Sequence, residues 1–132
     1  MNTEPPVDAS VGAGDGSDVG EAIRFDVVDH GPAVRVLHVV GELDTLTAPL
    51  LGARLAEQQS AVPKLVVDLS EVSFLGSAGL AALVEAKDAA DRHGGQLLVV
   101  PGSRIVKRAL EATGLLSLFT VADDVPKALG AR

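Results

Sequence analysis

The stretch from residue 65 to residue 84, LVVDLSEVSFLGSAGLAALV, constrains the fold more than any other part of the chain. Its first residues form a nearly unbroken apolar run, which predicts a strand buried on both faces of a sheet. A short polar loop follows, and an Ala- and Leu-rich helical pattern then begins at Ser77. A buried strand that leads directly into a helix is the building unit of an α/β fold with a mostly parallel sheet.

Apolar periodicity and turn residues place the other elements. They predict strands over residues 23–28, 33–40, 64–69, 96–100 and 118–121, and helices over residues 48–59, 77–93, 104–113 and 123–129. The order is β-β-α-β-α-β-α-β-α, with a hairpin at the start and right-handed crossovers after it. We therefore expect a single α/β domain that has a mostly parallel β-sheet, one antiparallel edge strand and about four helices.

Capping residues mark the ends of two of these helices. The pair Gly94-Gly95 can terminate the helix that begins near Ser77. Ser103 suits the N-cap position of the third helix because its hydroxyl can accept a hydrogen bond from a backbone N–H. The inner face of that helix is predicted to carry Ile105, Val106, Ala109, Leu110 and Thr113.

Composition narrows the chemistry that is available. The chain has three Phe, no Trp and no Tyr, so its core is built from Val, Leu, Ile and Ala. It has no Cys, which excludes disulfides, thiolate catalysis and thiol redox sensing. The apolar runs are strand-sized and no signal-peptide pattern opens the chain, so we expect a cytoplasmic protein without membrane insertion.

The net charge of −7 is unevenly distributed. Residues 1–22 contain five acidic side chains and no Lys or Arg, and they are rich in Pro, Gly and Ser. Such a composition buries too little apolar surface to offset the entropy of ordering, so residues 1–22 are predicted to be a disordered acidic tail. Residues 23–132 form the predicted domain, which is nearly neutral and shows no basic stripe for direct nucleic-acid binding.

Ser77 can have three roles at the start of a helix: a nucleophile, an N-cap or a phosphorylation site. A hydrolase elbow needs Gly two residues before the serine, and that position is Leu75. The candidate bases are His30, His38 and His93, and His93 would lie about 24 Å away along the helix. Hydrolysis is therefore disfavoured, whereas the cap and the phosphorylation site remain open. No phosphate-binding loop motif occurs in the chain.

Three segments in register carry a resemblance to a known family. The chain has GELDTLTAP after its second predicted strand, LVVDLSEVSFLGSAGLAALV around Ser77, and IVKRALEATGLLSLFTVADDVPKAL near its end. From Ile23 to Leu129 this pattern resembles the STAS family, and most closely the bacterial anti-sigma factor antagonists (anti-anti-sigma factors) of the sporulation and general-stress pathways. The resemblance implies a STAS-like domain that is not an enzyme and that needs no cofactor or metal.

The resemblance also implies partners. In the family, the unphosphorylated antagonist binds an anti-sigma factor that is also a GHKL-type serine kinase, and this binding frees a sigma factor. The kinase phosphorylates a serine at the start of the second helix, which breaks the complex, and a PP2C-type phosphatase restores it. That serine corresponds to Ser77, and an aspartate in the partner-facing loop before the first helix corresponds to Asp44.

The rest of the predicted partner surface surrounds these two residues. It comprises Thr45, beside Asp44, and the small residues Gly76, Ala78 and Gly79, which allow a partner to approach closely. Two positions depart from the family pattern: Gly76 replaces a frequent aspartate, and Ala78 replaces a common second hydroxyl. The missing acid is expected to change kinase recognition or to lower the rate of phosphorylation.

Two other roles fit a stand-alone protein of this family. It could be the cytoplasmic subunit of a lipid or anion transporter, or a core member of a large stress-sensing assembly. A small-molecule binding module is a weaker option because no phosphate-binding loop exists. Isolation of the native partner separates these roles: a GHKL kinase indicates sigma-factor control, whereas a permease or ATPase subunit indicates transport.

Overall fold

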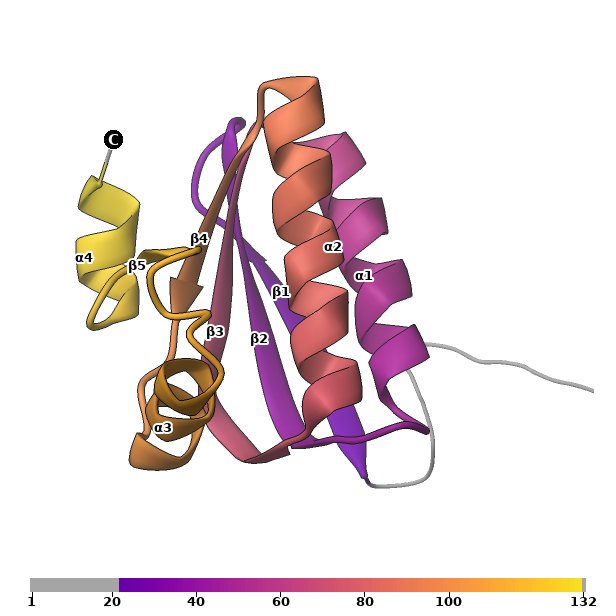
Figure 1. Ribbon diagram of the computed structural model, residues 1–132. Coiled ribbons are helices and arrows are strands. Elements are labelled where there is room, and N and C mark those ends of the chain that lie inside the picture. Colours follow the sequence, from indigo (N-terminus) through magenta and orange to yellow (C-terminus); the bar gives the residue numbers. More distant parts are fainter. Residues whose placement is uncertain (1–21, 132) are drawn as a thin grey trace, which may run out of the picture.

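A computed structural model of the chain describes residues 22–131 (Figure 1). Five strands form one sheet in the order β1-β2-β3-β4-β5, with β1 antiparallel to β2 and the other neighbours parallel. The strands are β1 (Ile23–Asp29), β2 (Val34–Leu43), β3 (Lys64–Leu75), β4 (Gln96–Val100) and β5 (Thr120–Val121), and the helices are α1 (Ala48–Ala61), α2 (Ser77–His93), α3 (Arg104–Ala112) and α4 (Val125–Gly130). The predicted order of elements and the antiparallel edge are confirmed. Of the predicted acidic tail, residues 1–21 lie outside the described residues.

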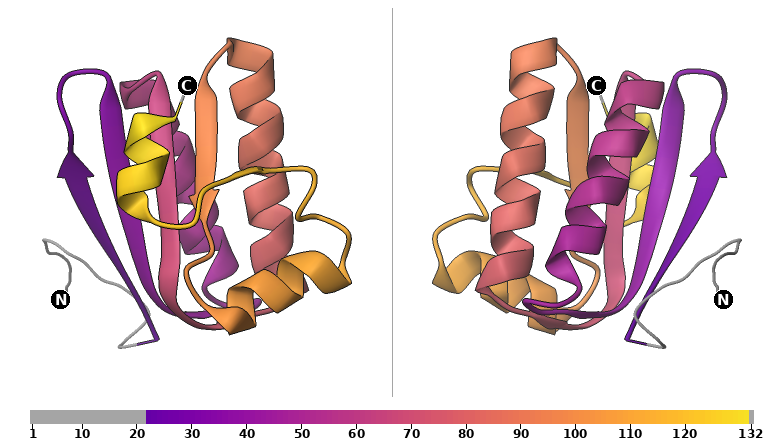
Figure 2. Two further views of the ribbon diagram at one scale, coloured as in Figure 1. Left: turned by 90° about the vertical axis from the view of Figure 1, so that its left-hand side faces the viewer. Right: turned by 90° about the vertical axis from the view of Figure 1, so that its right-hand side faces the viewer.

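The helices lie on both faces of the sheet. Helices α1 and α2 lie side by side on one face, and α4 covers part of the other (Figure 2). On β3, Leu65, Val67 and Leu69 pack into the core beneath α1 and α2, whereas Val66 packs with Ala128 of α4. Burial of alternate residues on opposite faces explains the unbroken apolar run at the start of β3.

Strand β3 is longer than its sequence pattern predicts. The polar stretch after Leu69 was expected to be a loop, but the strand continues to Leu75 and remains paired with β2. Val72 and Leu75 are buried in this extension, whereas Glu71 and Phe74 are exposed. The pairing with β2 shifts register twice along this stretch. Pairing with β2 and the burial of Val72 and Leu75 therefore both stabilise the last part of β3.

Helix α3 contacts the core through a narrower stripe than predicted. Val106 and Leu110 are buried, but Ile105 is 53% exposed, so its predicted place on the inner face is wrong. Thr113, also predicted to face inward, is exposed and follows the last helical residue. A helix of two and a half turns that crosses the end of a sheet buries only residues one turn apart. The predicted cap is confirmed, because the Ser103 hydroxyl accepts a hydrogen bond from the N–H of Val106.

Candidate functional site

The candidate site lies where β2 and β3 end at the same edge of the sheet (Figure 1). The chain after β2 forms a turn that enters α1, and the chain after β3 enters α2 directly. The N–H of Gly76 donates a hydrogen bond of 2.9 Å to the carbonyl of Leu43, the last residue of β2. This bond joins the start of α2 to the end of β2, so the topology places the predicted partner-surface residues on two adjacent loops.

Ser77 is the first residue of α2, and it is exposed. The N-cap residue is Gly76, which has an extended backbone, so Ser77 itself is not the cap. The first N–H groups of any helix lack intrahelical acceptors, and the positive end of the helix dipole favours a negative charge there. The serine hydroxyl is thus accessible, is not used as a cap, and stands where the backbone can accommodate an anionic group.

Glycine at position 79 allows α2 to pack directly on the ends of β2 and β3. A Cβ atom at Gly79 would lie 2.8 Å from the Cβ of Leu43 and 2.9 Å from a methyl group of Leu75. Such contacts are closer than packed side chains tolerate, so the helix can sit at this distance only without a side chain at this position. Gly79 therefore fixes the first turn of α2, including Ser77, against the sheet.

The Phe74 ring lies beside Gly76. A Cβ atom at Gly76 would lie 3.0 Å from Cε2 of this ring, and Phe74 is half-exposed. An aspartate at position 76 would therefore need the ring to move. A second exposed large apolar side chain in these two loops is that of Leu46, which is 72% exposed. Phe74 and Leu46 were not predicted as part of the site, although large apolar residues in predicted polar loops are a usable signal of a contact surface.

Asp44 stabilises the turn that leads into α1 through hydrogen bonds. Its Oδ1 atom accepts hydrogen bonds of 3.0 Å from the N–H groups of Leu46 and Thr47. Thr47 is fully buried, and its hydroxyl donates to the carbonyl of Glu42 at 2.7 Å while it accepts from the N–H of Asp44. Thr47 occupies the N-cap position of α1, but its side chain makes no cap bond. The turn is consequently a closed hydrogen-bond network that fixes the orientation of the Asp44 carboxylate.

Hydrogen bonds lower the pKa of Asp44 below its ordinary value of 3.8, and the N–H of Thr47 contributes most. Partial burial raises the pKa of Asp44, but this effect is smaller than that of the hydrogen bonds. Because the pKa is depressed in the folded state, the charged carboxylate stabilises the fold above the unfolded-state pKa. This contribution disappears as the pH falls through the folded-state pKa. Asp44 therefore carries a full negative charge near neutral pH.

Two substitutions at Asp44 distinguish the hydrogen bonds that its Oδ1 atom accepts from the effect of its negative charge. Asp44→Asn keeps an oxygen that can accept the two N–H groups, so we expect a smaller fall in Tm than for Asp44→Ala, which leaves both donors without an acceptor. The difference in Tm between wild type and Asp44→Asn should shrink as the pH falls below 3.8, because the wild-type carboxyl then becomes neutral. Thermal unfolding of the three proteins over a pH series measures both effects. Equal losses for Asn and Ala would contradict the role of Oδ1 as the acceptor of the turn.

None of the three histidines is placed to activate Ser77. The Nδ1 atom of His38 lies 2.7 Å from Oδ2 of Asp68, in the middle of the sheet. His30 follows β1 at the opposite end of β2, and His93 is the last residue of the helix that Ser77 begins. In the part of the chain that the structure describes, no group of three His, Cys, Asp or Glu residues could hold a metal ion. Within residues 22–131, none of the histidines can therefore act as the base for a serine nucleophile.

The remaining predicted residues lie beside Ser77 and Asp44. Thr45 is exposed in the turn, and Ala78 is half-buried in the first turn of α2. Ser73, the nearest other hydroxyl residue along the sequence, lies within β3, and its Oγ is 3.4 Å from the carbonyl oxygen of Gly41. Over residues 22–131, no helix combines the length and the apolar character that a bilayer crossing requires.

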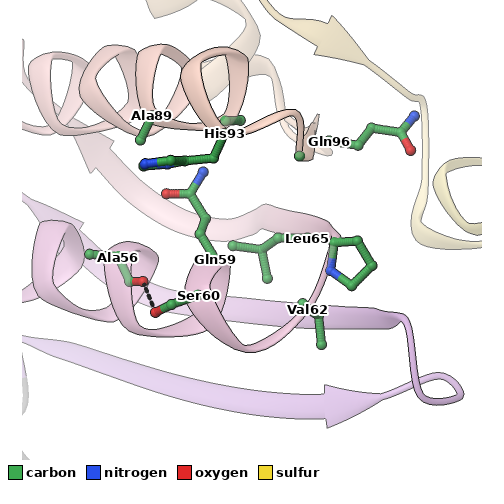
Figure 3. A pocket seen from close by; sticks show the side chains of 11 residues that line it. Ala56, Gln59, Ser60, Val62, Leu65, Ala89, His93 and Gln96 are labelled. Atoms are coloured by element: carbon green, nitrogen blue, oxygen red, sulfur yellow. Dashed lines mark hydrogen bonds between the residues drawn. The ribbon is translucent and has the colours of Figure 1, made fainter.

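A cavity of about 490 Å³ lies at the other end of α1 and α2, far from Ser77 (Figure 3). His93 and Gln59 face each other across it. The Nε2 atom of Gln59 donates a hydrogen bond of 2.8 Å to the carbonyl of Ala86, which joins the two helices. This cavity shares no residue with the candidate site, so it plays no part in the chemistry around Ser77.

Comparison with known proteins identifies relatives of the whole domain. The family model described as STAS domain matches residues 26–128. The chain is 34% identical over 110 residues to the anti-sigma-F factor antagonist RsfB of Mycobacterium tuberculosis, covering 83% of this chain and 88% of that protein.

Solved structures agree with this relationship. The crystal structure of an anti-sigma factor antagonist from Mycobacterium paratuberculosis has a TM-score of 0.72 and 31% identity, and the match covers 86% of this chain and 97% of that one. The structure of the Bacillus cell fate determinant SpoIIAA in its phosphorylated form has a TM-score of 0.62 at 18% identity, with 81% and 97% covered. The second likeness concerns the fold alone.

Proposed function

We propose a function from one premise: the chain belongs to the STAS domain family, within the anti-sigma factor antagonists. Antagonists of this kind are regulators rather than enzymes. We infer that this protein binds an anti-sigma factor that is also a GHKL-type serine kinase and thereby releases a sigma factor in the cytoplasm. Phosphorylation of Ser77 by the kinase ends the binding, and a PP2C-type phosphatase restores it.

The position of Ser77 is the observation that carries this proposal. The residue is exposed, stands at N1 of α2 and is not needed as the helix cap. A phosphoserine there has a charge of about −1.5 to −2 at neutral pH. The helix start stabilises such a charge by roughly 0.3–2 kcal/mol, so the domain remains folded when it is modified.

The effect of the phosphate falls on the complex instead. A partner that docks closely over Gly76 and Ser77 would bury the phosphate away from water. Burial of an unpaired charge is unfavourable by several kcal/mol, which is enough to dissociate a complex of moderate affinity. The mechanism therefore needs no change in the fold, only a change in the surface that the partner meets.

The first experiment is isolation of the native partner followed by a kinase assay. Affinity purification with the full chain should recover a GHKL-type kinase. Incubation with that kinase and ATP should place phosphate on Ser77 and not on Ser73, as measured by mass spectrometry of the digested protein. Recovery of a permease or a transport ATPase instead, with no kinase, would replace this proposal by the transporter-subunit role.

Gly76→Asp tests how the neighbour of Ser77 affects the kinase. Aspartate is a favourable N-cap residue, so Gly76→Asp should be more stable than Gly76→Ala by about 1 kcal/mol, although both displace the Phe74 ring. We expect the Asp variant to be phosphorylated faster than wild type, because it restores the acid that the family often has before the serine. The initial rate of phosphate incorporation measures this. A slower rate would mean that the kinase recognises the apolar surface formed by Phe74.

Asp44 is proposed to contact the partner through its charge. The Asp44→Asn variant keeps the turn, so any loss of affinity for the anti-sigma factor reports on the carboxylate itself. We propose that Thr45, Gly76 and Ala78 complete the contact surface, and that Gly79, which is buried against Leu43 and Leu75, supports this surface from beneath. No cofactor or metal is required for this function.

A further inference from the structure

A second cavity, of about 640 Å³, lies between α3 and the chain around β5. Its lining includes no residue of the Ser77 site. Three cationic side chains of α3 line it: Arg104, Lys107 and Arg108. They are spaced three and four residues apart, which places them on one face of the helix.

These cations have no ionic partner within residues 22–131. The Lys and Arg residues that form ion pairs there are Arg24, Arg35, Lys87 and Lys127. Arg54 instead lies over the Phe25 ring, and Lys64 donates to carbonyl groups near the end of α4. With Arg92 of α2, the three exposed residues of α3 are therefore the cations of residues 22–131 without such a contact, and these three lie close together in one helix.

This cluster of three cations also lies near the start of α3, which is the end of a helix where positive charges are least favourable. Arg104 is the first residue of α3, and the first turn contains no acidic residue. Cations at a helix start oppose the helix dipole, and like charges three and four residues apart repel each other. Both effects destabilise the free helix, and an anion held between the three side chains would reverse both. Such local conflicts are expected at functional sites.

The acidic residues of the lining do not neutralise the cluster. Asp123 is 3.4 Å from Nζ of Lys127. Glu111 lies four residues after Lys107 and three after Arg108, but within residues 22–131 it forms no ion pair with either, and it is about 10 Å from Arg104 along the helix axis. The cavity is therefore polarised, with its cationic end at the start of α3.

The wall of the cavity around the three cations is tightly packed and partly apolar. Gly102 has φ +68°, and a Cβ atom there would lie 2.2 Å from the Cβ of Ser70, so the turn before α3 packs tightly on β3. Beyond the cations the lining includes Pro101, Leu116 and the half-exposed Val121. This surface suits the carbon skeleton of a ligand rather than a bare inorganic ion.

We infer that this cavity binds a small phosphate monoester. The phosphate is held by Arg104, Lys107 and Arg108, and the organic part packs on Pro101, Leu116 and Val121. A phosphate monoester carries nearly two negative charges at neutral pH, and the planar guanidinium groups of the two arginines match its oxygen atoms in paired hydrogen bonds. The proposal is independent of the function proposed for Ser77.

Phenyl phosphate is a suitable probe, with phenol and inorganic phosphate as the comparison ligands. Titration of the full chain, followed by NMR, should shift the amide signals of residues 102–108 and 121. Phenyl phosphate should bind more tightly than inorganic phosphate, and phenol should not bind. Equal affinity for phenyl phosphate and inorganic phosphate, or shifts confined to other residues, would overturn the proposal.

The double variant R104Q/R108Q gives the decisive comparison. Its affinity for phenyl phosphate should fall about tenfold or more. The matched control is R92Q, which removes another cation without an ion pair in residues 22–131 but does not line this cavity, and it should bind as wild type does.

Stability provides a readout that separates binding from a structural role. Without ligand, R104Q/R108Q should have a Tm equal to or higher than wild type, because the repulsion within α3 is relieved. Phenyl phosphate should raise the Tm of wild type and R92Q but not that of the double variant. A lower Tm for the free double variant together with unchanged affinity would mean that the cations serve the fold alone.

Discussion

Ser77→Glu is expected to weaken binding to the anti-sigma factor about tenfold or more, which corresponds to about 1.4 kcal/mol, while the domain stays folded. The new carboxylate stands at the start of α2, where the helix dipole favours it. The partner, in contrast, must cover a charge that it cannot neutralise. Calorimetric titration and thermal unfolding of the same preparation measure the two quantities.

Ser77→Ala is the matched control for this experiment. A methyl group adds no charge and allows the same close approach, so binding should be retained while phosphorylation is abolished. If Ser77→Glu binds as tightly as Ser77→Ala and no phosphate is ever found on Ser77, the phosphorylation switch is wrong for this protein. The partner assignment would survive that result, because it depends on affinity purification and not on the modification.

Gly41→Ala is expected to cause the largest loss of stability. Gly41 has φ +125°, and a Cβ atom there would lie 2.1 Å from the carbonyl oxygen of Ala22. That oxygen accepts a hydrogen bond from the N–H of Glu42, so it cannot move aside without breaking the bond. Backbone strain of roughly 1–3 kcal/mol and overpacking of roughly 1–3 kcal/mol add to each other here.

The loss is large against the total stability of a small domain, about 5–15 kcal/mol. At about 4 °C per kcal/mol, the Tm should fall by roughly 10–20 °C. Gly52→Ala is the control: Gly52 lies within α1 and has no atom within 4 Å of an added Cβ. Alanine there should raise stability by up to about 1 kcal/mol. A Tm for Gly41→Ala within a few degrees of wild type would show that β1 and β2 separate easily at this end.

The sequence by itself determined the class of fold and the place of the serine. The apolar run at the start of β3 is short, rich in Val and preceded by Pro63, and these features favour a strand buried on both faces over a buried helix. The small residues from Gly76 to Gly79 and the periodic pattern after them placed Ser77 at a helix start. These features are local, so periodicity and capping chemistry within a few residues are sufficient to predict them.

The tertiary structure decided the surroundings of that serine. The polar end of β3 becomes a strand only because β2 supplies its hydrogen-bond partners, and no pattern within residues 70–75 reveals this pairing. The same pairing places Phe74 beside Gly76 and makes Gly76 rather than Ser77 the helix cap. Likewise, only the crossing of α3 over the end of the sheet exposes Ile105. Contacts between segments distant in sequence depend on how the elements pack, and local preferences do not encode them.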